Sequence, residues 1–346
     1  MKIGFYSPYF DSMSGGERYL LTIASHWSKS HDVFLFWDDP KILVQSEKRF
    51  HIDLTRIRTT ENVFKTKNVF KKLAISRGYD LIFFLTDGSI PTTFAKRNIL
   101  HFQVPFQHIP VHPIKLLRFQ AIVCNSFFTK DHLDPRVGKQ SIVIYPPVEP
   151  VKKSSLSGSG FARKNVILSV GRFHPMKKQD VLIDVFRKAM RAKQLSGFEL
   201  KLAGGLQPAD KLYFDALKRA AKGLPVRFFP NCTFRSLTGL YNESLVYWHA
   251  AGYGATKPEH MEHFGITTVE AMSAGCIPVV FNGGGQSEII NRNLWTTPDE
   301  CLEMTQHIIQ NVKDLSALRE DMIQRSKRFN VITFTKAFDA LVSDIT

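Results

Sequence analysis

The stretch VILSVGRFHPMKKQDVLIDVFRKAMR, residues 166–191, contains one complete strand, turn and helix. Val166–Val170 is a mostly apolar run with the length of a buried β-strand. Gly171 ends that run, and Gln179–Arg191 then has the length and pattern of an amphipathic helix. A strand followed directly by such a helix is typical of parallel α/β sheets.

The same alternation extends outward in both directions along the chain. In the second half, the other expected strands are Leu200–Ala203, Val226–Phe229, Leu245–His249 and Ile277–Phe281, and the other expected helices are Pro208–Ala221, Leu237–Glu243 and Ile266–Ala274. In the first half, the expected strands are Lys2–Ser7, Asp32–Phe36, Leu81–Leu85, Asn98–Phe102 and Ala121–Cys124, and the expected helices are Glu17–Trp27 and Val63–Ser76. Each half therefore reads as a doubly wound, Rossmann-like α/β domain.

The length of the chain also favours two domains. Its 346 residues correspond to about two domains of ordinary size. Pro146–Lys164 is rich in Pro, Ser, Gly and Lys and has no apolar period, as expected of a linker. We therefore predict one domain over residues 1–149, a linker over residues 150–164 and a second domain over residues 165–327.

The composition is that of a globular protein with an excess of positive charge. Hydrophobic residues make up 44% of the chain, which argues against disorder and against a fibrous repeat. Forty-six Lys and Arg against 31 Asp and Glu give a net charge of +15. This charge leaves nucleic acid, an anionic membrane and phosphorylated small molecules open as partners.

The cysteines and the N-terminus indicate the compartment. Cys124, Cys232, Cys276 and Cys301 are far apart and lack the spacing of zinc ligands, so we expect reduced thiols. The N-terminal MKIGFYSPYF turns polar too early for a signal peptide, and no run approaches the roughly 18 apolar residues of a spanning helix. We therefore expect a cytoplasmic protein.

A glycine turn follows the first expected strand. Ser14-Gly15-Gly16-Glu17 opens a helix, and the N–H groups at a helix N-terminus favour an anion. The turn lacks the form GxGxxG, and no acidic residue stands in position for a ribose, so NAD binding is disfavoured. A plain tight turn between strand and helix is the alternative interpretation.

Two cations follow the strand Val166–Val170. Arg172 and Lys177 both precede the helix that begins at Gln179. Arg offers a planar fork and Lys a point charge, a combination that suits pyrophosphate oxygens at the carboxyl end of a parallel sheet. Solvated surface charge is the alternative.

Two acids stand at the start of a later helix. In EHFGITTVEAMSAG, residues 262–275, Glu262 lies in the loop and Glu270 about one turn inside the helix. The N–H groups of Phe264, Gly265 and Ile266 form a helix N-terminus that can hold a phosphate. The two acids can then bind different parts of one ligand, while an ordinary helix start with a solvated Glu270 is the alternative.

The segment from Glu262 to Glu270 has the form E-x7-E, and it resembles the retaining glycosyltransferases of family four (group 1), which have the GT-B fold. Other landmarks follow in the family's order: Gly15-Gly16, a strand ending at His101, residues 123–129 (VCNSFFT), residues 144–148 (IYPPV), the G-R…K segment at Gly171, Arg172 and Lys177, residues 202–205 (LAGG) and Arg328–Val342. The resemblance covers essentially the whole chain. It implies two Rossmann-like domains facing a central cleft, with residues 1–149 on the acceptor side, residues 165–327 binding the nucleotide sugar, and a C-terminal helix at 328–346 that returns to the first domain.

The resemblance also implies the roles of the charged residues. Arg172 and Lys177 neutralise the donor diphosphate, with Lys178 as a weaker substitute for Lys177. Glu262 binds hydroxyls of the transferred sugar, and Glu270 binds the ribose hydroxyls. These four assigned residues all belong to the second expected domain.

Residues without charge complete the implied site. Gly15 and Gly16 let a loop of the first domain close over the phosphates, supported by the N–H groups of Phe264 and Gly265. His101 contacts the donor sugar near the reacting carbon, and His249 is a weaker candidate for lining the same cleft. The implied catalytic set is His101, Glu262, Arg172 and Lys177.

The implied mechanism is front-face attack with retention of configuration. The acceptor hydroxyl gives its proton to a phosphate oxygen of the leaving diphosphate, so no enzymatic nucleophile is required. Two flanking carboxylates, as in glycosidases, are the competing mechanism. We expect no metal or other cofactor, because Asp38-Asp39-Pro40 lacks a third ligand at useful spacing and Arg172 with Lys177 can screen the diphosphate of a UDP- or GDP-sugar.

The acceptor is indicated only by a basic segment. Residues 63–78 carry five cations and no acid, interleaved with apolar side chains, and Lys115 and Arg118 could extend the patch. Such a segment can lie on an anionic membrane surface, whereas an ordinary helix with one solvated face is the alternative. A saccharide or lipid-linked acceptor in envelope, polysaccharide or glycolipid synthesis, reached by peripheral docking at the inner face of the membrane, is the resulting hypothesis.

Two other functions remain as alternatives. A sugar-nucleotide epimerase or a phosphorylase-like enzyme could use the same scaffold. A nucleic-acid-binding protein is suggested by the charge of +15 alone, and no RNP-like strand, zinc spacing or recognition helix supports it. We therefore expect no nucleic-acid partner.

Overall fold

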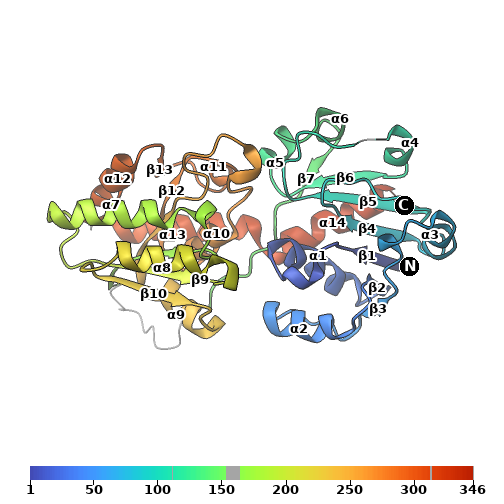
Figure 1. Ribbon diagram of the computed structural model, residues 1–346, viewed down its shortest axis with the longest axis horizontal. Coiled ribbons are helices and arrows are strands. Elements are labelled where there is room, and N and C mark those ends of the chain that lie inside the picture. Colours follow the sequence, from blue (N-terminus) through green and yellow to red (C-terminus); the bar gives the residue numbers. More distant parts are fainter. Residues whose placement is uncertain (111, 153–163, 312–313, 346) are drawn as a thin grey trace. The chain divides into compact units, whose positions relative to one another are not determined.

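The computed structural model describes residues 1–110, 112–152, 164–311 and 314–345. It divides into two compact units, Met1–Pro147 with Val331–Thr346 and Val148–Asn330. Each unit contains one sheet flanked by helices (Figure 1). The predicted fold class of two Rossmann-like α/β domains is confirmed. The predicted linker, residues 150–164, lies mostly outside the described residues.

The first unit has a seven-stranded sheet in the order β3-β2-β1-β4-β5-β6-β7. The strands are β1 (Lys2–Tyr6), β2 (Asp32–Phe36), β3 (Arg58–Thr60), β4 (Leu81–Leu85), β5 (Arg97–Phe102), β6 (Ala121–Cys124) and β7 (Ile142–Val143). All neighbouring pairs are parallel. The edge strands β3 and β7, which the sequence analysis missed, have three and two residues, too few to show a pattern.

Helices cover both faces of this sheet because successive strand residues point to opposite sides. Phe5 and Phe83 belong to one buried cluster, and Ile82 and Phe84 belong to another. The helices are α1 (Gly15–Trp27), α2 (Lys41–Phe50), α3 (Val69–Ser76), α4 (Pro113–Leu116), α5 (Phe127–Asp131), α6 (Pro135–Gly138) and α14 (Val331–Ile345). Two-sided burial explains why the strand β4, LIFFL, is apolar throughout.

The last helix, α14, packs on α1 within the first unit. The Tyr19 ring meets Phe334 edge-on at a centroid distance of 4.7 Å. The indole N–H of Trp27 donates to Asp339 Oδ1 at 2.9 Å. These contacts hold the end of the chain against its first helix.

The predicted helix over Val63–Ser76 is wrong in its first part. Val63–Lys65 forms a short 3₁₀ turn, and α3 begins only at Val69. The side chain of Asn68 accepts a hydrogen bond from the Lys71 N–H at 3.1 Å. This contact caps the N-terminus of α3, so the helix begins there and does not include the 3₁₀ turn at Val63–Lys65.

The second unit has a six-stranded sheet in the order β10-β9-β8-β11-β12-β13. Its strands are β8 (Lys164–Val170), β9 (Glu199–Gly204), β10 (Val226–Pro230), β11 (Ser244–His249), β12 (Ile277–Phe281) and β13 (Leu294–Trp295), all paired in parallel. The order reverses its direction between β8 and β11. This reversal is the topological switch point, where open parallel sheets bind ligands outside the carboxyl ends of the strands.

Helices of the second unit enclose a separate buried cluster. They are α7 (Gln179–Arg191), α8 (Lys211–Ala220), α9 (Phe234–Glu243), α10 (Ile266–Ser273), α11 (Gln286–Ile289), α12 (Pro298–Gln310) and α13 (Leu315–Ser326). Helix α7 buries Leu182, Ile183, Phe186 and Ala189 completely, on the single stripe expected of an amphipathic helix.

None of the helices in the described part of the chain combines enough length with enough apolar character to cross a bilayer.

Candidate functional site

The candidate site lies at the carboxyl ends of β8 and β11, on either side of the switch point of the second sheet. Arg172 follows β8 by two residues, and His249 is the last residue of β11. Glu262 stands in the loop before α10, so a third segment reaches the same edge. Loops diverge at such a switch point and leave a crevice between them.

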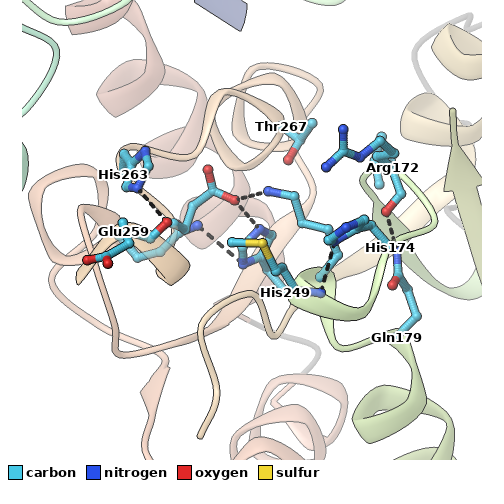
Figure 2. Close-up of polar contacts among 12 residues, drawn as sticks. Arg172, His174, Gln179, His249, Glu259, His263 and Thr267 are labelled. Atoms are coloured by element: carbon cyan, nitrogen blue, oxygen red, sulfur yellow. Dashed lines mark hydrogen bonds and ion pairs between the residues drawn. The ribbon is translucent and has the colours of Figure 1, made fainter. Parts of the chain in front are cut away.

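Glu262 has two basic partners. Its Oε2 lies 2.6 Å from Lys177 Nζ and 3.2 Å from His249 Nε2, and Figure 2 draws these contacts around His249. The side chain of Glu262 is 17% exposed, against 32% for Lys177. The structure thus brings Lys177, which is predicted to bind the diphosphate, into direct contact with Glu262, which is predicted to bind the sugar.

The electrostatics of Glu262 follow from these partners. Burial raises the pKa of Glu262, but the positive charge of Lys177 and the His249 hydrogen bond outweigh burial and hold the pKa well below its usual range. Glu262 is therefore an ionised carboxylate at neutral pH, able to accept hydrogen bonds.

A glycine turn supports the backbone of Glu262. The Gly285 N–H donates to the Glu262 carbonyl oxygen at 2.8 Å. At Gly284, with φ of +69°, a Cβ atom would stand 1.9 Å from the same carbonyl oxygen. Only glycine fits there, because both the backbone conformation and the space exclude a side chain.

Glu270 lies on the first turns of α10 and accepts a hydrogen bond from the Tyr241 hydroxyl at 2.9 Å. Tyr247 connects it to Glu262: burial raises the pKa of the Tyr247 phenol, and the negative charges of Glu262 and Glu270 raise it further. The Tyr247 hydroxyl donates to Thr267 Oγ1 at 2.8 Å. The charges of both acids of E-x7-E thus act on the one buried hydroxyl of Tyr247.

The N-terminus of α10 is shaped by Gly265. This residue has φ of +116°, and a Cβ atom there would stand 2.7 Å from Nε2 of Gln286. Phe264 is 3% exposed, and its ring packs edge-on against Phe329 at 5.2 Å. The backbone at 264–266 is therefore fixed by packing, and the first N–H groups of a helix have no intrahelical acceptors.

Arg172 and Lys177 belong to one loop. Arg172 is exposed, and its carbonyl oxygen accepts a hydrogen bond from Gln179 Nε2 at 2.9 Å (Figure 2). Burial lowers the pKa of His174, and the positive charges of Arg172 and Lys177 lower it further. His174 is therefore a neutral residue that stands between Arg172 and Lys177 in the sequence of this loop.

The four charged residues of the candidate site lie in a part of the chain that matches a known protein family. They are Arg172, Lys177, Glu262 and Glu270. Residues 155–329, about half of the chain, match the family described as "Glycosyl transferases group 1". The chain belongs to this family. The predicted family is confirmed, and the cations and acids above occupy the matched region.

Curated relatives of this group 1 member share part of its length. It is 26% identical over 240 residues to the GDP-Man:Man(3)GlcNAc(2)-PP-Dol alpha-1,2-mannosyltransferase of Dictyostelium discoideum, covering 63% of this chain and 46% of that protein. The enzyme of the same name from Homo sapiens is 27% identical over 235 residues, covering 62% and 45%. The chain spans about half the length of these relatives.

Solved structures show the same fold. HepE of Anabaena, crystallised in complex with UDP and glucose, matches with a TM-score of 0.75 and 20% identity, over 99% of this chain and 100% of that one. WaaG, a glycosyltransferase involved in lipopolysaccharide biosynthesis, matches with a TM-score of 0.61 and 13% identity, over 97% and 98%. The group 1 member therefore has the GT-B fold.

The first unit of this group 1 member holds the predicted glycine turn. Ser14 and Glu17 form a capping box at the start of α1, and Glu17 is 1% exposed. A Cβ atom on Gly16 would stand 2.7 Å from the Gln103 side-chain oxygen, so Gly16 is in close contact with Gln103. The predicted phosphate-binding role of Gly15 and Gly16 stays a prediction.

His101, also in the first unit, is fully buried. Its Nδ1 donates to the Val123 carbonyl oxygen at 3.1 Å, its Nε2 lies 3.1 Å from Gln103 Nε2, and its ring stacks on Tyr19 at 4.1 Å. Burial lowers the pKa of His101 to about 3. The histidine is therefore neutral and hydrogen-bonded at both nitrogens, and its contact with a donor sugar stays a prediction.

The candidate site includes residues that the sequence did not reveal or that it favoured only weakly. Tyr247, Tyr241 and Gln286 had no assigned role, and His249 was a weak candidate. The available signal was position, since Tyr247 and His249 lie near the carboxyl end of a parallel strand.

Within the described ranges, no group of three or more His, Cys, Asp or Glu residues stands close enough together to hold a metal ion. Asp38, considered earlier as a ligand, accepts the Asn62 N–H at 2.8 Å and lies 3.4 Å from Lys65 Nζ. The positive charge beside Glu262 is that of the Lys177 ammonium group, which lies 2.6 Å from Oε2.

Proposed function

We propose that the chain is a retaining glycosyltransferase that moves a sugar from a nucleotide diphosphate to a saccharide or lipid-linked acceptor. The observation that carries this proposal is the contact of Lys177 with Glu262 at the switch point of the second sheet, which joins a cation suited to a diphosphate with a carboxylate suited to sugar hydroxyls. Membership of the group 1 family supports it.

The test is incubation with UDP-, GDP- and ADP-sugars and candidate acceptors. Acceptor-dependent release of the nucleoside diphosphate is the expected result. Formation of a new nucleotide sugar indicates an epimerase instead, and a requirement for inorganic phosphate indicates a phosphorylase. Either outcome contradicts the proposal.

The donor we propose is a UDP- or GDP-sugar. Two relatives are named for GDP-mannose, and the structure of HepE contains UDP. A thermal-shift screen across sugar nucleotides identifies the base, because a ligand at 100 times its dissociation constant adds about 2.7 kcal/mol of stability. A base that gives no shift at millimolar concentration is excluded as the donor.

Arg172 and Lys177 are proposed to stabilise the leaving group. Negative charge on the diphosphate grows as the sugar leaves, and cations held in a crevice of low dielectric act most strongly on such growing charge. The planar guanidinium of Arg172 offers two parallel N–H donors to a phosphate. We therefore propose a reaction without metal, for which unchanged activity in EDTA is the expected result.

We propose that transfer occurs by front-face attack. The bond between the acceptor oxygen and the anomeric carbon forms on the side where the bond to the diphosphate oxygen breaks, and the acceptor proton passes to that phosphate oxygen. Glu262 accepts hydrogen bonds from hydroxyls of the sugar and does not act as a nucleophile. NMR of the glycosylated product tests this mechanism. We expect its anomeric configuration to be that of the donor, and inversion of that configuration contradicts front-face attack.

The acceptor side is proposed to dock on an anionic membrane. Four large apolar side chains are exposed on or next to α3 and α4: Val69 at 50%, Phe70 at 83%, Ile114 at 70% and Leu117 at 81%. Together with Lys67, Lys71, Lys72, Lys115 and Arg118, these residues form what we call the α3–α4 surface. Apolar tips among cations match an interface of lipid tails and anionic headgroups.

The two parts of the α3–α4 surface lie close together. Burial lowers the pKa of Lys72, and the positive charge of Lys115 lowers it further. Ile75 of α3 and Leu116 of α4 pack on the same buried cluster. Cations near an anionic leaflet contribute about 1 kcal/mol each. A peripheral protein on the inner face of the membrane, acting on a lipid-linked or glycolipid acceptor, is the localisation we propose.

A further inference from the structure

The second partner of Glu262 is His249, a residue of the second sheet itself. Oε2 of Glu262 lies 3.2 Å from His249 Nε2 and 2.6 Å from Lys177 Nζ, so one carboxylate oxygen receives both contacts. His249 is 4% exposed at the end of β11, whereas the side chain of Lys177 is 32% exposed. The two partners therefore differ in exposure: His249 is enclosed, and Lys177 is partly open to solvent.

Gln286, the first residue of α11, holds the ring of His249. Its Nε2 lies 3.3 Å from His249 Nδ1, and Gln286 is fully buried. Gly265 makes room for this side chain, since a Cβ atom there would stand 2.7 Å from Nε2 of Gln286. When Gln286 donates to Nδ1, a neutral ring carries its proton on Nε2 and donates it to Glu262.

Lys177 has two tasks that compete. In this structure its ammonium group is bonded to Glu262, and under the proposed function the same group neutralises the donor diphosphate. Turning toward the diphosphate weakens the contact with Glu262. Leaving a buried carboxylate without a partner is energetically costly. A diphosphate that binds Lys177 must therefore draw it away from Glu262 at that cost.

We propose that His249, oriented by Gln286, is a positioning residue that keeps Glu262 hydrogen-bonded while Lys177 turns to the diphosphate of the donor. This inference rests on the proposed function. His249 makes Lys177 available to the ligand without touching the ligand itself. In the described part of the chain, His249 and Lys177 both approach Oε2 of Glu262, which leaves its Oε1 for a sugar hydroxyl.

The proposal predicts how nucleoside diphosphate binding responds to His249. In His249→Leu, Lys177 is the remaining basic partner of Glu262 in the contacts above, so Glu262 retains it and a diphosphate binds more weakly. Adding Glu262→Gln removes the negative charge and frees Lys177. In His249→Gln the amide nitrogen takes the place of Nε2 and can still donate to Glu262. Gln286→Leu frees the ring to turn and should act in the same direction as His249→Leu, more weakly.

Isothermal titration with UDP, GDP and ADP, on the full chain, tests these relations. For the nucleotide that binds, we expect His249→Leu to raise the dissociation constant by about tenfold, or about 1.4 kcal/mol, and Gln286→Leu by about threefold. We expect His249→Gln to lie near the wild type and His249→Leu/Glu262→Gln to match Glu262→Gln alone. His307→Leu, on the exposed His307 of α12, is the matched control and leaves binding unchanged.

Thermal unfolding of each variant separates folding from binding. If His249→Leu does not fold, Gln286→Leu compared with Gln286→Leu/Glu262→Gln carries the same test. Wild-type affinity in the folded His249→Leu or Gln286→Leu variant overturns the proposal, and so does weak binding that Glu262→Gln fails to restore. If the wild type binds no nucleoside diphosphate, the proposed function is contradicted, and this inference with it. That result is distinguishable from the two outcomes above, in which the wild type does bind.

Discussion

Lys177 and Glu262, 85 positions apart in the sequence, are joined by an ion pair of 2.6 Å. One residue lies in the loop after β8 and the other in the loop before α10, so the contact links two loops at the carboxyl edge of the second sheet. Because one partner suits phosphate and the other suits sugar hydroxyls, changes at either residue should separate the handling of the two parts of a donor.

Exchanging the two acids of E-x7-E for amides should have different kinetic effects. Glu262→Gln should lower kcat by about 100-fold, because a charged acceptor for the reacting sugar is lost. Glu270→Gln should chiefly raise KM for the donor by about tenfold, as expected for a hydrogen bond to a charged group. Steady-state kinetics with the donor identified by the thermal-shift screen measures both, and unchanged kinetics in both variants contradicts the donor-site assignment.

The neighbouring lysines should differ in importance. Lys177→Ala removes the cation bonded to Glu262 and should lower kcat/KM by about 100-fold, whereas Lys178→Ala should change it by less than about threefold. Lys178 stands at the start of α7 with φ of +54°, a position that alanine also tolerates poorly, so both proteins need a check of thermal stability. A larger effect at Lys178 shows that the second cation was assigned one residue too early.

Gly284 should be intolerant of any side chain. Gly284→Ala combines a positive φ with a Cβ only 1.9 Å from the Glu262 carbonyl oxygen, and we expect a loss of roughly 3 kcal/mol of unfolding free energy together with lost activity. Gly223 is the matched control, because its φ is +80° and nothing lies within 4 Å of its Cβ position. Gly223→Ala should cost only about 1 kcal/mol. Equal losses in urea unfolding would show that the backbone conformation alone matters.

Acid should destabilise the first unit through His101. Burial lowers the pKa of this histidine to about 3, below the usual value of 6.5. Unfolding then takes up a proton at any pH between these values, so the stability is full above about pH 6.5 and decreases as the pH falls toward 3. Between these two values the free energy of unfolding falls by about 1.4 kcal/mol for each pH unit, which makes a loss of about 3 kcal/mol at pH 4.5.

Urea unfolding from pH 7.5 to 4.5 measures this dependence. His101→Phe keeps a ring against Tyr19 and removes the titrating group, so its stability should fall less steeply with acid. His307→Phe, at an exposed position of α12, serves as the control and should follow the wild type. Parallel profiles for all three proteins contradict the role of His101.

The α3–α4 surface should bind anionic vesicles through both charge and apolar contact. Phe70→Ser/Leu117→Ser should lower co-sedimentation with vesicles of phosphatidylglycerol and phosphatidylcholine by about tenfold. Leu212→Ser, at the equally exposed Leu212 of α8, should have no effect. Binding that does not depend on anionic lipid, or that both variants lower equally, contradicts docking by this surface.

The fold was predictable because its signals are local. A strand that is buried on both faces must be apolar along its whole length, as LIFFL of β4 shows, and a helix on such a sheet must carry one apolar stripe, as α7 shows. The missed strand β13 has two residues, which is too short for any period to appear. The first part of the predicted helix 63–76 failed because Asn68 offers its side chain as a cap at 3.1 Å, a local competition that periodicity does not register.

The site was predictable only in part. E-x7-E, Arg172 and Lys177 could be found because each lies in a short segment with a recognisable pattern. Gln286 and His249, 37 positions apart, have no pattern in common, and their contact of 3.3 Å depends on where the glycine turn after β12 places α11. Tyr247 shows the same limit, since an aromatic residue at a strand end is ordinarily part of the core.

The amino-acid order by itself determined which segments become strands and helices, the positive charge and the residues able to bind a phosphorylated ligand, because burial and charge act on each segment separately. Only the tertiary structure decided that Lys177 and His249 share one oxygen of Glu262, that Gln286 sets the orientation of His249 and that His101 is enclosed beside Tyr19. Such contacts join residues that lie far apart in the sequence and on different strands, helices and loops. Their distances are set by packing, which no single segment specifies.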